Sequence, residues 1–136
     1  MLQSNIFIPR KLHGLMLEAI KRLDAANIWP DSRSQHFAFV ESKAYENANS
    51  VHEAMKAWRW FVDCDDEDNI ITTEFLGEKL GDEDILFEAI APFVRDGSTI
   101  QMAGEDGKIW RWIFHQGTVQ QQEGRVVFPP PNFTLR

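Results

Sequence analysis

The last third of the chain constrains the fold most, because strand-like segments alternate there with tight turns. Residues 98–103 and 108–115 are rich in β-branched and aromatic side chains, and the sequence Gly-Glu-Asp-Gly at 104–107 separates them. Asp-Gly is the strongest short-range signal for a β-hairpin, because its residues accept the positive φ angles of the turn. A second turn at 116–117 precedes residues 118–123. The sequence therefore predicts a β-meander.

Helical and strand-like patterns precede this meander. Apolar residues recur every three or four positions between residues 12 and 27, which is typical of an amphipathic helix. Two strand-like segments flank an acidic turn at 65–69 and predict a hairpin over 58–76. The other expected elements are strands at 5–8 and 36–40, a helix from Asn47 or Asn49 to Trp58, and a helix that opens at 82–84 and closes by Gly97. This order predicts an α+β fold with a mostly antiparallel sheet and about three helices packed on one face, with a ferredoxin-like arrangement as one candidate topology.

The chain is expected to form a single soluble domain over residues 1–136. Its 136 residues suffice for one core, and no segment is long enough to serve as a linker between domains. Three prolines at 129–131 cannot join a central strand, so residues 125–136 are expected to form a loosely ordered tail. The single cysteine, Cys64, excludes an internal disulfide and fits a reducing cytoplasm. No apolar run approaches the roughly 18–20 residues of a membrane span.

Charge is distributed unevenly along the chain. The formal net charge is −7, and residues 63–88 hold eleven of the 21 acids but one base, Lys79. Such a segment repels nucleic acid phosphates and attracts a basic protein, so no direct binding of nucleic acid is expected. The predicted partner-binding residues are the acids of the turn and of the following helix start: Asp65, Asp66, Glu67, Asp68, Asp82, Glu83 and Asp84.

Two Trp-Arg-Trp triplets place four large aromatic residues on strand-like segments. They are Trp58-Arg59-Trp60 and Trp110-Arg111-Trp112. In a strand, both tryptophans of a triplet lie on one face, and the arginine lies on the other. A core position is favoured for these tryptophans because aromatic residues dominate protein cores. The alternative is that Trp58, Trp60, Trp110 and Trp112 are exposed anchors for a protein partner.

No motif in the sequence predicts catalysis, a cofactor or a metal site. Residues 63–74 place acids at positions 1, 3, 5 and 12 of a Ca²⁺ loop, but Asp68 stands where such a loop needs glycine. A Ca²⁺-binding loop therefore remains only an alternative to an acidic surface turn. The histidines at 13, 36, 52 and 115 lack metal-ligand spacing. The acids around Cys64 should keep its thiol protonated and unreactive.

Part of the chain resembles a group of small uncharacterised proteins of bacteria and their mobile elements. The resemblance rests on residues 66–70, on Gly-Glu-Lys-Leu-Gly at 77–81, on 86–94 and 96–98, and on 104–107 followed by Trp-Arg-Trp at 110–112 and Phe114. It covers less than half of the chain and implies a compact domain without a known activity. Members of the group have a glycine before Ile70, whereas this chain has Asp68 and Asn69. Because Asn tolerates the left-handed conformation, the turn is expected to form.

Together these observations favour a non-enzymatic acidic protein that binds a basic partner. A toxin-neutralising immunity protein or an anti-defence inhibitor, for example one of the anti-CRISPR kind, would have this character, because each meets a basic protein that acts on nucleic acid. One alternative is a small enzyme or ligand-binding protein whose site is assembled from scattered Trp, His and acidic residues. A homodimer formed through an exposed strand is also compatible with the sequence.

Overall fold

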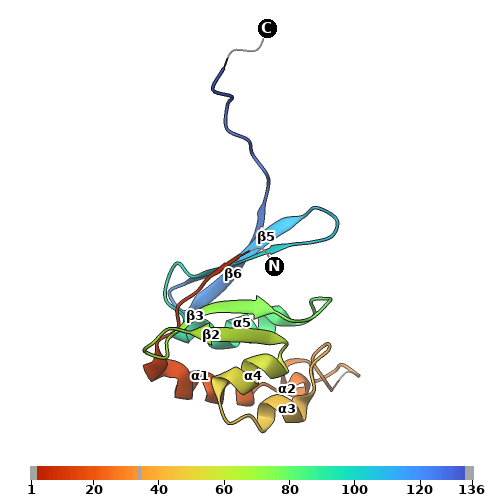
Figure 1. The fold of residues 1–136 in the computed structure, drawn as a ribbon. Helices are drawn as coiled ribbons and strands as arrows, with labels where there is room; N and C mark the ends of the chain where they lie inside the picture. The colour runs from red at the N-terminus through yellow and green to blue at the C-terminus, as the bar shows by residue number, and fades with distance from the viewer. Residues whose placement is uncertain (1–2, 34, 134–136) are drawn as a thin grey trace.

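The computed structural model describes residues 3–33 and 35–133, and its architecture is α+β as predicted. Within these residues the chain forms two antiparallel sheets, one of four strands and one of two. Figure 1 shows the four-stranded sheet at one end of the molecule, helices α1–α4 at the other, and the two-stranded hairpin between them. The described elements thus stack in layers around a shared interior.

The four-stranded sheet contains the predicted meander. Its strands are β1 (Gln3–Asn5), β4 (Thr99–Ala103), β5 (Ile109–His115) and β6 (Thr118–Gly124), in the order β1-β4-β5-β6. Trp112 at the centre of β5 pairs with Ile100 on one side and with Gln121 on the other. β6 is therefore an edge strand that has β5 as its neighbour on one side.

The hairpin of β2 (Trp60–Cys64) and β3 (Ile70–Phe75) forms the second sheet, as predicted from the flanks of the acidic turn. The hairpin contacts the N-terminal segment: Ile8, which follows β1, pairs with Ile70, and the Thr73 N–H donates to the hydroxyl of Ser4 in β1 at 3.0 Å. The ferredoxin-like expectation is wrong. In that topology the hairpin strands belong to the main sheet, whereas here β2 and β3 form a separate two-stranded sheet.

The helices are shorter and more numerous than the predicted three. They are η1 (Arg10–Leu12), α1 (His13–Lys21), α2 (Ala25–Ile28), α3 (Ser42–Glu46), α4 (Val51–Ala57), α5 (Glu83–Ile90) and η2 (Ala91–Phe93). The helix expected at 12–27 is interrupted because the Asp24 carboxylate accepts the Ala26 N–H and starts α2. The cap of α4 is Ser50, whose hydroxyl accepts the Glu53 N–H, rather than Asn47 or Asn49.

Two predicted strands in the first half are wrong. Residues 36–40 form a turn in which the Val40 N–H donates to the Phe37 carbonyl, and Phe39 adopts a left-handed φ of 62°. In the segment at 5–8 only Asn5 belongs to a strand, and Ile8 makes an isolated bridge. These segments contain β-branched and aromatic residues because the residues fill the core rather than form strands. Ile8 and Phe37 are both buried.

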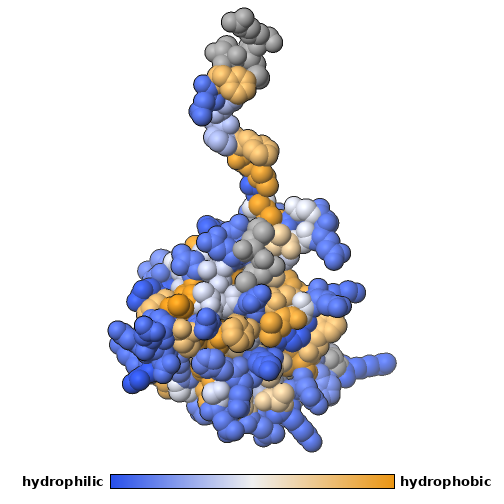
Figure 2. All heavy atoms as spheres, viewed as in Figure 1, coloured by the Kyte–Doolittle hydropathy of each residue, from blue (hydrophilic) through white to orange (hydrophobic). Residues whose placement is uncertain are grey.

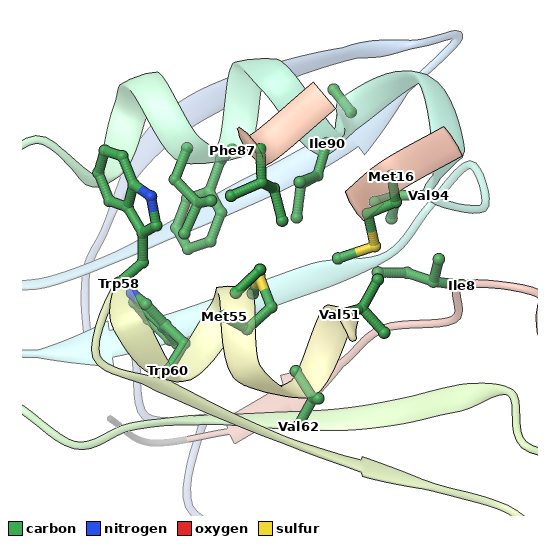
Figure 3. Close-up of a cluster of buried hydrophobic side chains, with 14 of the residues drawn as sticks. Ile8, Met16, Val51, Met55, Trp58, Trp60, Val62, Phe87, Ile90 and Val94 are labelled. Atoms are coloured by element: carbon green, nitrogen blue, oxygen red, sulfur yellow. The ribbon is translucent and has the colours of Figure 1, made fainter. Parts of the chain in front are cut away.

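Helix α5 joins the hairpin and the four-stranded sheet into one core. The ring of Phe87 on α5 lies 5.1 Å from that of Trp60 on β2 and 4.8 Å from that of Trp112 on β5. Figure 3 shows Phe87 and Ile90 of α5 facing Met55 of α4 across this interior. Residues 125–133 leave the end of β6 as an extended arm that points away from the body (Figure 1), and residues 134–136 of the predicted tail lie outside the described part.

Candidate partner-binding surface

The hairpin has one buried face and one exposed face. Trp60 and Val62 point inward, whereas Phe61 and Asp63 lie on the opposite face, as the alternation of a strand requires. On the exposed face Phe61 pairs with Glu74, and Asp63 pairs with Thr72. We call the segment 60–75 the acidic hairpin, because it contains six Asp or Glu residues and no Lys or Arg.

The carboxylate of Asp65 holds the turn of the acidic hairpin together. Its Oδ1 accepts the backbone N–H groups of Glu67 and Asn69 at 3.0 and 2.9 Å, and its Oδ2 accepts the Asn69 amide at 3.1 Å. Asp68 takes the left-handed conformation with φ 65°, so the residue that replaces the expected glycine is Asp68 rather than Asn69. These hydrogen bonds lower the pKa of Asp65 below its ordinary value.

Asp65 should make the stability of the hairpin sensitive to acid. Its pKa is depressed in the folded chain, so its contribution is present above the unfolded pKa of about 3.9 and is lost as the pH falls through the folded pKa. We expect Asp65→Asn to be less stable than the wild type at pH 7. The difference should shrink below about pH 4. Urea unfolding at several pH values measures it, and a constant difference down to pH 2 would contradict this role.

The remaining acids of the turn are free of such bonds and face solvent. Asp66, Glu67 and Asp68 are exposed. The basic segment η1 contacts the turn, because the backbone N–H of Arg10 donates to the Asn69 side chain at 3.0 Å. The structure thus assigns different roles to the predicted acids: Asp65 shapes the turn, and Asp66, Glu67 and Asp68 present its charge to the outside.

Apolar side chains lie beside these charges, which the sequence reasoning did not identify as part of a site. Phe61 is 47% exposed, and Ile71 and Leu76 are also exposed. Figure 2 shows apolar atoms among hydrophilic ones over the region that the hairpin occupies in Figure 1. The signal for Phe61 was its position between Trp60 and Val62, because strand alternation puts it on the face opposite the core.

The acids at the start of α5 do not form part of an open acidic patch. Glu83 is 1% exposed, and its carboxylate accepts hydrogen bonds from Arg59 at 3.0 and 3.3 Å and from the Gly81 N–H. The prediction that Glu83 binds a partner is therefore wrong. Its carboxylate is buried and is already paired with Arg59, as a buried charge requires. The half-buried Asp82 accepts the Ala38 N–H, and the exposed Asp84 accepts the Trp112 indole N–H at 2.8 Å.

Arg59 is the centre of a structural cluster around Glu83. Its guanidinium lies between the rings of Phe39 and Phe75, at 4.8 and 5.1 Å, and donates to the Lys79 carbonyl at 2.6 Å. Arg59 has a left-handed φ of 72°. A Cβ on Gly77 would lie 2.6 Å from the Phe75 ring and 2.8 Å from the Arg59 guanidinium, so any other residue there would displace these side chains. This arrangement ties the loop after β3 to the body.

Three of the four tryptophans cannot serve as surface anchors. Trp58 and Trp60 are 0% exposed and Trp112 is 3% exposed, so the favoured core interpretation is confirmed for them and the anchor alternative is wrong. Their large apolar areas stabilise the fold by packing. Trp110 is half-buried near the start of β5, and its ring centroid lies 6.4 Å from that of Trp112. The exposed aromatic residue of the hairpin is instead Phe61.

Cys64 and His52 lie close together without forming an activated pair. The Cys64 Sγ is 3.5 Å from the His52 Nε2. Partial burial, followed by the charges of Asp68, Asp63 and Asp65, raises the pKa of the thiol, which keeps it protonated. Among residues 3–33 and 35–133 no group of three or more His, Cys, Asp or Glu side chains is arranged to hold a metal ion.

A hollow of about 900 Å³ opens beside Trp110, where the arm leaves β6. Its wall includes Asp106, Lys108, Glu123, Arg125 and Val126 together with Trp110. Histidine does not occur among the residues that line it, so the hollow differs from the Trp- and His-lined site of the ligand-binding alternative.

No family model, curated protein or solved structure matches this chain. No helix in the described part of the chain has the length and apolar character needed to cross a membrane.

Proposed function

We propose that this chain binds a basic protein through the exposed face of the acidic hairpin and carries no catalytic activity of its own. The observation that carries the proposal is Phe61, a large aromatic side chain that is 47% exposed on a hairpin whose residues 60–75 include no Lys or Arg. Exposed apolar groups with polar residues around them are typical of binding surfaces, and Phe61 lies opposite Glu74 on this face. Such a face needs a partner with Lys and Arg around an apolar recess.

Charge and apolar contact would act at different stages of binding. The carboxylates of Asp66, Glu67 and Asp68 would accelerate the encounter with a basic surface. Phe61 would then be desolvated at the interface and slow dissociation. The hairpin is suited to this because it is held from behind: the Thr73 hydroxyl donates to the Phe61 carbonyl at 2.9 Å, and Trp60 and Val62 anchor the inner face.

The class of partner follows from the same charge pattern. Proteins that act on nucleic acids carry clustered Lys and Arg to contact phosphates. A rigid hairpin with six acids offers such a surface a negative ligand in place of phosphates. We therefore propose an inhibitor of a basic nucleic-acid-acting protein in the cytoplasm, of the immunity or anti-defence kind. The partial resemblance to small proteins of bacterial mobile elements supports this proposal.

Neutralising the hairpin tests this function against a matched control. The wild type is expected to capture a basic protein from a lysate of the source cell at low salt. We expect the triple variant Asp66→Asn/Glu67→Gln/Asp68→Asn not to capture this protein. The control Glu18→Gln/Glu46→Gln/Glu105→Gln removes three exposed acids elsewhere and changes net charge equally, so it should retain that protein. Mass spectrometry of the captured proteins is the readout, and higher salt should reduce capture by wild type. Equal capture by both variants would contradict the proposal.

A further inference from the structure

The free edge of β6 and the arm that follows it are unpaired surfaces of a kind that proteins usually protect. β6 (Thr118–Gly124) pairs with β5 on one side, and no described strand lies along its other side. Val126, Val127 and Phe128 continue the chain at 70%, 70% and 85% exposure. Figures 1 and 2 show that the arm carries apolar residues and projects away from the body. A long open edge beside an exposed apolar segment is a template for pairing with another chain.

We propose that two copies of the chain pair through this edge, antiparallel and centred on Gly124. The sequence around that point is Glu123-Gly124-Arg125. In an antiparallel pair with a two-fold axis at Gly124, Arg125 of each copy lies opposite Glu123 of the second copy. The register thus forms two cross-strand pairs of opposite charge, which stabilise neighbouring strands, and the same surface serves both copies.

The same register places the exposed apolar residues along the second copy's β6. Val127 falls opposite Gln121 and Phe128 opposite Gln120, both of which are exposed on the free edge strand. Pro129 has no N–H and would end the pairing there. The hollow beside Trp110, whose wall contains Gln121, Glu123 and Val126, borders this path and would receive apolar side chains of the second copy's arm.

The chemistry of β6 supports a second copy as the occupant. Three consecutive glutamines, Gln120 to Gln122, leave the centre of the strand uncharged, whereas edge strands that avoid pairing carry charges or proline. Gly124 has no side chain at the point where two backbones would meet, which is a typical position for glycine within a strand. The surface lies on β6 and the arm, so it leaves the acidic hairpin free for its own partner.

A charge-swap experiment on the full-length chain tests the register. We expect wild type to be a dimer by light scattering coupled to size exclusion at micromolar concentrations. Glu123→Arg and Arg125→Glu each replace opposite charges by like charges at two positions, and should weaken dimerisation about tenfold or more. The double variant Glu123→Arg/Arg125→Glu restores opposite charges and should restore the dimer. Both residues are exposed, so the variants should fold, which circular dichroism confirms.

A charge reversal outside β6 and the arm serves as the control. Glu46→Arg reverses an exposed charge on α3 and should dimerise as wild type does. A wild type that stays monomeric up to millimolar concentration would overturn the proposal and point to an extended peptide of another protein as the occupant of the edge. Dimers that survive either single reversal, or a double variant that stays monomeric, would overturn the register centred on Gly124.

Discussion

Glu83→Ala is expected to lower the free energy of unfolding by about 3–5 kcal/mol, the usual cost of leaving one partner of a buried ion pair alone. Arg59 would keep its charge between the rings of Phe39 and Phe75 with its carboxylate removed. The Gly81 N–H would lose its acceptor as well. Urea unfolding followed by circular dichroism measures the change, and a loss under about 1 kcal/mol would show that solvent already screens the pair.

A double variant separates the ion pair from the packing around it. Arg59→Met/Glu83→Leu removes both charges and keeps apolar bulk, and such replacements are often neutral or stabilising. It should therefore be more stable than Glu83→Ala alone. Asp84→Asn provides the matched control, because Asp84 is an exposed acid on the same helix turn that accepts the Trp112 indole N–H. The control should lose far less stability than Glu83→Ala.

Trp60→Ala is expected to lower the free energy of unfolding by about 3–5 kcal/mol, because it leaves a large cavity in the core. Trp60 is 0% exposed, and its ring contacts Phe75, Phe87 and Trp112 at centroid distances of 5.1, 5.1 and 6.3 Å. Removing it detaches the inner face of the hairpin from both α5 and β5. The loss comes from packing, because its indole N–H has no hydrogen-bond partner among the described residues.

The neighbouring Phe61 is the control for Trp60. It is on the same strand but on the exposed face, so Phe61→Ala should change the free energy of unfolding by well under half as much as Trp60→Ala. Thermal unfolding of the two variants under identical conditions compares them. Equal losses would contradict the assignment of opposite faces, on which the proposed binding surface depends.

The elements predicted from sequence are those whose signals are local. The Asp-Gly turn at 106–107 and the acidic turn at 65–69 are formed where expected, because turn chemistry and strand alternation act over a few residues. The segment around Phe37 and Phe39 has strand-like residues but is folded as a turn. Its conformation is set by distant contacts, among them the Asp82 carboxylate on the Ala38 N–H, which no short pattern encodes.

The candidate site likewise combines features that local sequence predicts with features that distant contacts determine. The acidic turn was located from composition, and strand alternation is enough to put Phe61 and Trp60 on opposite faces. The sequence could not show that Glu83 is buried, because its partner Arg59 lies 24 residues away. The tryptophans were correctly favoured as core, yet alternation alone does not say which face of a hairpin is covered. That depends on where α5 packs.

The two proposed partners would use separate surfaces of the fold. The acidic hairpin faces outward between the helical layer and the four-stranded sheet, and β6 with its arm lies at the far end of that sheet (Figure 1). A dimer through β6 would carry two acidic hairpins, so it could hold two copies of a basic partner or one partner with two sites. Linked sites of this kind gain affinity through effective concentration when the geometry allows both to engage.

The most direct test of the central claim is site-specific photo-crosslinking from the hairpin. A photoreactive phenylalanine analogue replaces Phe61 in one version of the chain and Leu15 in the other, since Leu15 is also an exposed apolar residue, at 60% on α1. Both versions are expressed in the source cell, irradiated, and recovered under denaturing conditions for mass spectrometry. The account predicts a crosslink to a basic nucleic-acid-acting protein from position 61 and none from position 15. Crosslinks only from position 15, or only to acidic proteins from position 61, would contradict it.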